Sequence, residues 1–168
     1  CATNRALVNV DETVGHDCLM LRSASLRAFR GQKIGLLGGS FNPPHEGHMH
    51  IIKLAIKHLE LNNLWCLVSP QNPLKSVREM APLRRRITEA RRVLKWPFVT
   101  VSDIEAELLT RYSVDTIKAL IKKYPGVKFV WIMGADNLVQ INRWQGWDQI
   151  FKLVPVAVFD RPPYSLLA

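Results

Sequence analysis

Residues 38–48 read Gly38-Gly39-Ser40-Phe41-Asn42-Pro43-Pro44-His45-Glu46-Gly47-His48. The residues just before them, 33–37, form an apolar run typical of a buried parallel strand. After them, apolar side chains recur at helical spacing, at Met49, Ile52, Ala55, Ile56 and Leu59. Glycines let backbone N–H groups approach an anion, and a helix N-terminus supplies further donors and a positive dipole end. The stretch therefore predicts a phosphate-binding turn between a strand and a helix, with imidazoles that suit a triphosphate.

From residue 33 onward, apolar runs alternate with helical patterns. The runs predict strands at 33–38, 64–68, 98–102, 127–133 and 154–158, and the helical patterns predict helices at 46–60, 82–95, 113–123 and 146–152. This alternation is typical of an α/β fold, a Rossmann-like doubly wound parallel sheet with helices on both faces. Ligands of such sheets bind beyond the carboxyl ends of the strands. We therefore expect the loops at 38–48, 69–76 and 134–137 to meet at one edge.

The composition fits a single domain. The chain has 168 residues, of which 48% are hydrophobic and 22% charged, as in ordinary globular proteins. We expect residues 1–30 to be a poorly ordered N-terminal extension and residues 31–168 to form the domain. No apolar run reaches the roughly 18 residues that a membrane span needs, so no membrane partner is expected. The three cysteines include no C-x-x-C pair; together with a buried thiol at Cys66, this favours a cytoplasmic location.

The net charge of +9 is typical either of a solvated basic surface or of a protein with an anionic partner, which would be a nucleotide or a nucleic acid. A basic cluster lies in the helix predicted at 82–95, beside a stripe of apolar residues, and this spacing predicts a solvated helix face. No aromatic residues are interleaved with the cluster, so we expect no nucleic acid partner. The cluster comprises Arg84, Arg85, Arg86, Arg91, Arg92 and Lys95, and the stripe comprises Leu83, Ile87, Ala90 and Leu94.

The turn at 38–48 differs from three common motifs. No Gly-Lys-Ser or Gly-Lys-Thr follows its glycines, so it is not a Walker A loop, and Gly35, Gly38 and Gly39 do not have the G-x-G-x-x-G spacing. Two residues separate His45 from His48, whereas the zinc-binding H-E-x-x-H pattern has three. We therefore expect no metal site. What remains is G-x-F-x-P-x-H-x-G-H, or a proline-rich turn whose histidines cap a helix.

With every fixed position filled, this pattern resembles the nucleotidyltransferase superfamily that shares H-x-G-H with class I aminoacyl-tRNA synthetases. Its Gly-Gly-Ser-Phe-Asn-Pro-Pro-His form is similar to the bacterial nicotinate-nucleotide adenylyltransferases, and further matches extend this resemblance over residues 33–163. The matching segments are Ser69-Pro70-Gln71-Asn72-Pro73-Leu74-Lys75, Arg111-Tyr112-Ser113-Val114-Asp115-Thr116, Trp131-Ile132-Met133-Gly134-Ala135-Asp136-Asn137, Trp144, and Phe159-Asp160-Arg161-Pro162-Pro163.

The resemblance implies transfer of the adenylyl group of ATP to nicotinate mononucleotide, a step of NAD biosynthesis. It implies His45 and His48 as catalytic residues, with Mg²⁺ carried by ATP. The implied ATP-binding residues are Gly38, Gly39, Ser40, Phe41, His45, His48, Gly134 and Asp136. The implied residues for nicotinate mononucleotide are Asn72, Lys75, Tyr112, Ser113, Trp144 and Arg161. Two alternatives stay open: another H-x-G-H transferase (pantetheine-phosphate adenylyltransferase or a cytidylyltransferase), and a non-catalytic module that binds nucleotides or nucleic acid.

Considered singly, several of these residues have ordinary explanations. Ser113 is placed to cap a helix, Asp136 to cap the next one, and Trp144 to pack in the core. Lys75 and Arg161 are equally typical of exposed loops.

The sequence also departs from the family pattern. Arg111 and Ser113 replace the outer Ser and the Thr of the family's S-Y-T-x-D-T segment, which leaves open the choice between nicotinate and nicotinamide mononucleotide. In addition, 31–168 is expected to lack the family's C-terminal S-S/T-x-x-R segment, and a chain without it is expected to bind ATP phosphates poorly or to lack activity.

Overall fold

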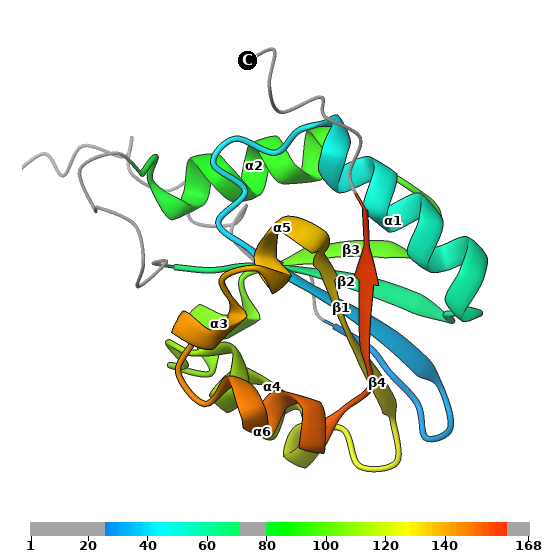
Figure 1. Cartoon of the computed structure of the whole chain (residues 1–168). Helices are drawn as coiled ribbons and strands as arrows, with labels where there is room; N and C mark the ends of the chain where they lie inside the picture. The colour runs from blue at the N-terminus through cyan, green and yellow to red at the C-terminus, as the bar shows by residue number, and fades with distance from the viewer. Residues whose placement is uncertain (1–25, 71–79, 161–168) are drawn as a thin grey trace, which may run out of the picture.

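The computed structural model describes residues 26–70 and 80–160. Its core is one sheet of parallel strands in the order β3-β2-β1-β4-β5, coloured from blue to red along the chain in Figure 1. The strands are β1 (Lys33–Gly39), β2 (Asn63–Val68), β3 (Val99–Ser102), β4 (Lys128–Gly134) and β5 (Val156–Phe159). The predicted α/β, Rossmann-like fold is confirmed, because β1 lies in the middle of a parallel sheet, between β2 and β4.

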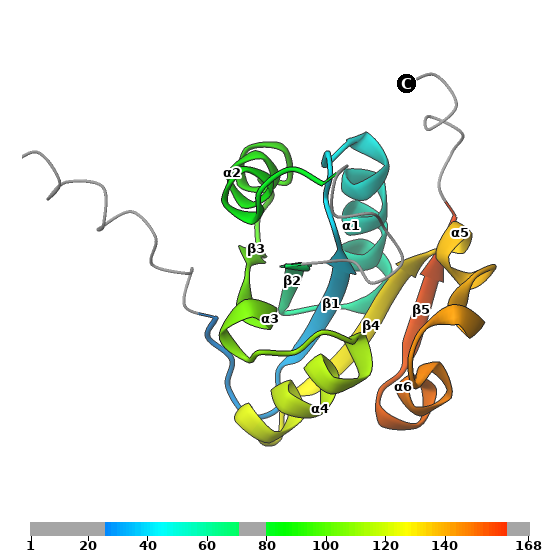
Figure 2. The ribbon, with the colours of Figure 1, turned by 90° about the vertical axis from the view of Figure 1, so that its left-hand side faces the viewer.

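Helices cover both faces of the sheet, as predicted (Figure 2). One face carries α1 (Glu46–Leu59) and α2 (Leu83–Val93), and the other carries α3 (Ile104–Glu107), α4 (Ser113–Lys123) and α6 (Trp147–Leu153). Two short elements follow β4, the helix α5 (Ala135–Leu138) and the 3₁₀ turn η3 (Ile141–Arg143). The elements α3, α5 and η3 were not predicted, because three or four residues are too short to show a period.

The central strands β1, β2 and β4 are buried on both faces, as the apolar runs predicted. Side chains of alternate residues therefore enter two separate cores. Trp65 and Trp131 belong to the core under α3, α4 and α6, whereas Cys66 and Ile132 belong to the core under α1 and α2. The burial predicted for Cys66 is confirmed, and burial raises the pKa of its thiol.

Observed element ends differ from the predicted ones by at most two residues. The last strand begins at Val156 rather than at 154, because α6 continues to Leu153 and the Val154 N–H still bonds the Ile150 carbonyl. Pro155 has no N–H to donate, so the regular ladder begins after it. At the other end of the described chain, Leu26 already packs in a core, and Tyr124 donates a hydrogen bond to its carbonyl.

No helix in the ranges 26–70 and 80–160 is both long enough and apolar enough to cross a membrane.

Candidate active site

A cavity of about 490 Å³ opens at the carboxyl edge of the sheet. Its wall includes Gly39 at the end of β1, Ser69 just after β2, and Gly134 at the end of β4. The Ser69 N–H donates to the Gly39 carbonyl over 3.0 Å, which ties the first two of these segments together. The prediction that the loops after these strands meet at one edge is thus confirmed for their described residues.

The turn after β1 is tightly packed on its neighbours. A Cβ atom added to Gly38 would lie 2.6 Å from Cη2 of Trp131, so a side chain at this position has no room. Phe41 adopts a left-handed backbone conformation with φ of 44° and is buried. Its ring packs against His48, with ring centroids 4.9 Å apart. The turn therefore has a fixed shape beneath the first residues of α1.

Two imidazoles form the start of α1. His45 is the N-cap: its Nδ1 accepts a hydrogen bond from the Gly47 N–H over 3.1 Å, while Nδ1 of His48 accepts from the His45 N–H over 3.2 Å. The rings lie against each other with centroids 3.9 Å apart. A ring nitrogen that accepts a hydrogen bond carries no proton, so a proton on either ring is on Nε2. Both histidines line the cavity, which therefore has two orientated imidazoles at a helix N-terminus.

The opposite wall contains a buried carboxyl group. Glu105 on α3 is only 6% exposed and lines the cavity. Thr116 donates to its Oε1 over 3.3 Å, and the hydroxyls of Thr110 and Thr116 are 2.8 Å apart. Burial raises the pKa of Glu105 to about 7, and hydrogen bonds from Thr116 and Ser69 oppose that rise. The group thus changes charge near neutral pH, within reach of a ligand.

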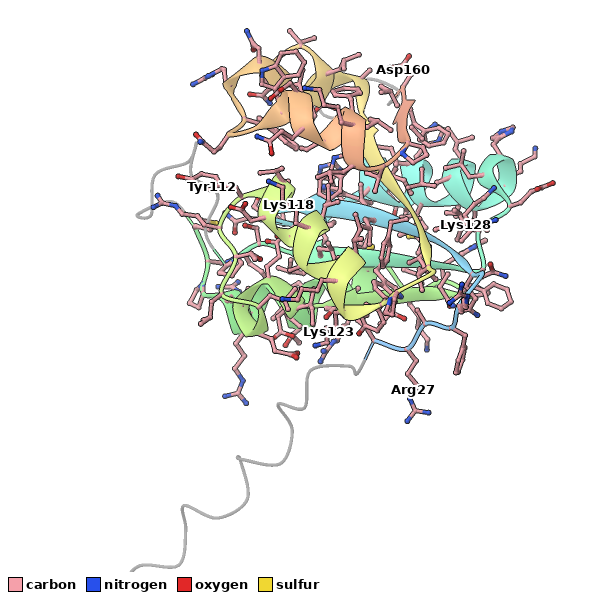
Figure 3. The ribbon with its side chains drawn as sticks, turned by 90° about the horizontal axis from the view of Figure 1, so that it is seen from below. Arg27, Tyr112, Lys118, Lys123, Lys128 and Asp160 are labelled. Atoms are coloured by element: carbon pink, nitrogen blue, oxygen red, sulfur yellow. The ribbon has the colours of Figure 1, made fainter. Side chains whose placement is uncertain are left out.

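Tyr112 and Ser113 lie at the beginning of α4, on the same wall. Figure 3 shows Tyr112 at one end of this helix and Lys123 at the other. Tyr112 occupies the N-cap position, and Ser113 is the first helical residue. The N-cap role considered for Ser113 is therefore wrong, and both residues line the cavity. Arg111 lines it too and lies over the Tyr112 ring, with Cζ 5.8 Å from the ring centroid.

The third wall follows β4. Asp136 lies in the first turn of α5, whose N-cap is Gly134. Trp144 packs edge-on against the buried Trp131, with ring centroids 6.4 Å apart, and it also lines the cavity. An aromatic ring that is held from behind and open in front offers a surface on which a planar group can stack.

One residue of the basic cluster does not lie on the solvated face. Arg84, Arg85, Arg91, Arg92 and Lys95 are exposed as predicted, but Arg86 is only 2% exposed. The prediction was wrong for Arg86 because this residue follows Leu83 by three positions and precedes Ala90 by four. That spacing places it on the apolar face of α2.

Residues 36–168 match the family model described as cytidylyltransferase-like. A protein of Parvibaculum lavamentivorans named "Probable nicotinate-nucleotide adenylyltransferase" is 52% identical over 138 residues, which cover 82% of this chain and 69% of that protein. A Cereibacter sphaeroides protein of the same name is 53% identical over 135 residues, covering 80% of this chain and 71% of that protein. The chain belongs to the nicotinate-nucleotide adenylyltransferase family.

A solved structure of this activity also shares the fold. Nicotinic acid mononucleotide adenylyltransferase of Plasmodium falciparum, complexed with NaAD, superposes with a TM-score of 0.58 at 18% identity. The match covers 78% of this chain and 76% of that one.

The cavity brings together most of the site residues that the family resemblance implied. Every residue implied for ATP lines it: Gly38, Gly39, Ser40, Phe41, His45, His48, Gly134 and Asp136. Of the residues implied for nicotinate mononucleotide, Tyr112, Ser113 and Trp144 line it. Asn72, Lys75 and Arg161 lie outside the described residues.

Several polar residues of the wall were not found from the sequence. These are Glu105, Asn137, Gln140, Arg143 and Gln145. They lie on or beside the short elements α3, α5 and η3, which have no periodic pattern. Arg86 was also missed, although its spacing from Leu83 and Ala90 was a usable signal.

Proposed function

We propose that this chain is a nicotinate-nucleotide adenylyltransferase of NAD biosynthesis, and that the cavity at the carboxyl edge of the sheet is its active site. Membership of the family supports the activity. One observation supports the location: the paired imidazoles of His45 and His48 line the cavity at the N-terminus of α1, each with Nδ1 engaged by backbone. Such a pair, together with the helix dipole, suits the charge of a triphosphate.

ATP would occupy the part of the cavity formed by β1, α1 and the end of β4. Backbone N–H groups of Gly39, Ser40 and Phe41 would face its phosphates, together with the rings of His45 and His48. Asp136 and the Gly134 backbone would hold the nucleoside, since a carboxylate accepts hydrogen bonds from ribose hydroxyls.

Nicotinate mononucleotide would lie against the other two walls. Trp144 would stack on its pyridine ring, and Tyr112 and Ser113 would bind it from the beginning of α4. For Asn72, Lys75 and Arg161 the proposal rests on the family pattern alone, with Lys75 and Arg161 as cations for its phosphate.

The chemistry needs no general base. An oxygen of the nicotinate mononucleotide phosphate, already ionised at neutral pH, attacks the α-phosphorus of ATP. The new P–O bond forms in line with the bond to the β-phosphate oxygen, which breaks and releases pyrophosphate. Catalysis then consists of positioning and of stabilising charge on the transferred group. We assign His48 mainly to that charge and His45 to the phosphates.

Mg²⁺ would enter with ATP and neutralise part of its phosphate charge. In the described ranges, no group of three or more His, Cys, Asp or Glu side chains is placed to hold a metal ion. Phosphate oxygens and water are ligands that Mg²⁺ prefers, and the triphosphate would supply the phosphate oxygens. A cytoplasmic location, where ATP is available, belongs to the same proposal.

The test measures the pyrophosphate that is released from ATP, in the presence of Mg²⁺, with different acceptors. We expect release with nicotinate mononucleotide, and a parallel assay with nicotinamide mononucleotide measures the ring preference. If neither pyridine nucleotide gives release, two further reactions are informative. Release from ATP with phosphopantetheine, or from CTP with an alcohol phosphate, would instead indicate another H-x-G-H transferase. Binding of ATP without release for any acceptor would indicate a non-catalytic nucleotide-binding protein.

A further inference from the structure

Arg86 is a buried cation in the first turn of α2. Its neighbours Arg84 and Arg85 are exposed, whereas Arg86 is only 2% exposed. Transfer of a charged group out of water costs free energy unless polar partners replace the water, and burial lowers the pKa of this guanidinium. An arginine nevertheless stays protonated in proteins, so the surroundings of Arg86 must compensate a full charge.

The compensation comes from four backbone carbonyls. Nε donates to Ala81 over 2.8 Å, and Nη2 donates to Pro70 over 2.9 Å. Nη1 donates to both Ser40 and Ser69, each over 2.7 Å. Among the ion pairs of residues 26–70 and 80–160, none involves Arg86. The planar guanidinium therefore donates its hydrogen bonds to main-chain carbonyls rather than to an acidic side chain.

These carbonyls belong to three segments that are distant in sequence. Ser40 lies in the turn after β1, Ser69 and Pro70 follow β2, and Ala81 precedes α2. Ser40 and Ser69 both line the cavity, but Arg86 does not. A second link runs alongside, because the Ala81 N–H donates to Oδ1 of Asn42 over 3.2 Å. Arg86 thus joins two walls of the site from behind.

We propose that Arg86 is a positioning residue for adenylyl transfer. It holds the phosphate-binding turn after β1 and the beginning of the loop after β2 at one fixed spacing. ATP and its acceptor are then held in line. The inference rests on the proposed function, in which the first segment binds ATP and the second leads to the acceptor. In-line attack is sensitive to small displacements, and about 1 Å of misplacement can cost about 10²-fold in rate.

The test compares three Arg→Lys variants of the full chain, Arg84→Lys, Arg85→Lys and Arg86→Lys. A lysine keeps the charge but lacks the planar fork that spans four carbonyls. We expect Arg86→Lys to lower kcat by about 10- to 100-fold, with a smaller change in either KM. Arg84→Lys and Arg85→Lys should match the native kcat. The assays are run under conditions in which circular dichroism shows that every variant is folded. A lower kcat then cannot be due to a loss of folded protein.

Two results have distinct meanings. If the native chain releases no pyrophosphate, the proposed function fails. If the native chain is active and folded Arg86→Lys has a kcat within twofold of Arg85→Lys, only the positioning role is overturned.

Hydrogen exchange of the native chain tests the same link if Arg86→Lys does not fold. Binding of a non-hydrolysable ATP analogue should slow exchange of the Ala81 and Arg86 amides, which lie outside the cavity wall. With the analogue at one hundred times its Kd, we expect these two amides to exchange at least tenfold more slowly. If their exchange were fully coupled to release of the analogue, it would slow by about 100-fold. The Leu94 amide, bonded to Ala90 at the far end of α2, is the control and should not change. Protection of Gly39 without protection of Ala81 and Arg86 would overturn the inference.

Discussion

The first turns of α1 and α2 lie on the same face of the sheet but use their polar side chains in opposite directions. In α1, His45 and His48 satisfy backbone N–H groups through Nδ1 and still line the cavity. In α2, Pro82 is the N-cap with no side-chain hydrogen bond, and Arg86 points inward to four carbonyls. The first turn of α1 thus faces the cavity, whereas that of α2 binds the main chain around it.

The difference follows from what each turn leaves unsatisfied. A helix N-terminus has spare N–H donors, which need acceptors or an anion. The turns after β1 and β2 instead have spare carbonyls, which need donors. Histidine can accept with one nitrogen and donate with the other, whereas arginine only donates. Each residue type therefore suits the turn in which it is found.

The largest effect is expected when the ligand-facing turn is changed. We expect His48→Ala to lower kcat by about 10²- to 10³-fold, as for removal of one donor to the transition-state charge. The KM for ATP should change much less, because the backbone donors of the turn remain. His50→Ala is the matched control, since His50 lies on the same helix but not on the cavity wall. Near-normal turnover in His48→Ala would contradict the role of this turn.

Glu105 extends the comparison to a buried group of the opposite charge. Its pKa is raised from 4.5 to about 7 in the folded state, so the folded protein holds a proton that the unfolded chain releases. This contribution to the free energy of unfolding is fully present below pH 4.5 and is lost as the pH rises through 7. The loss amounts to about 3 kcal/mol.

The uncharged variant Glu105→Gln keeps the shape of the side chain and has no carboxyl group to titrate. Measured by urea unfolding from pH 5 to pH 8, its stability relative to the native protein should therefore increase with pH. Parallel curves for the two proteins would show that the buried carboxyl does not control stability in this range.

A smaller effect is expected at the strand that leads into α1. A Cβ on Gly38 would lie 2.6 Å from the fully buried Trp131 ring, whereas one on Gly39 would have its nearest atom at 3.4 Å, in Phe41. We expect Gly38→Ala to destabilise the protein by about 1–3 kcal/mol. Gly39→Ala should cost less than about 1 kcal/mol. Urea denaturation of the two variants measures the difference, and equal midpoints would show that the turn after β1 can shift.

The sequence predicted the parts of this molecule that depend on periodic patterns or on a motif. Apolar runs located every strand of the described residues to within two residues of its observed ends, and the motif at 38–48 identified the turn that lines the cavity. The inward position of Arg86 was missed, because three adjacent arginines look alike unless each is placed on the helix face. Glu105 gave no signal at all, since α3 has four residues and its burial depends on segments far away in sequence.

Adenylyl transfer moves the α-phosphate of ATP into the product, so the fate of that phosphate decides whether this chain has the proposed activity. The native chain is incubated with Mg²⁺, nicotinate mononucleotide and ATP labelled at the α-phosphate. We expect the label to appear in nicotinate adenine dinucleotide, with unlabelled pyrophosphate released in equal amount. Label that stays in ATP, or that appears in AMP with the acceptor unchanged, would contradict the claim.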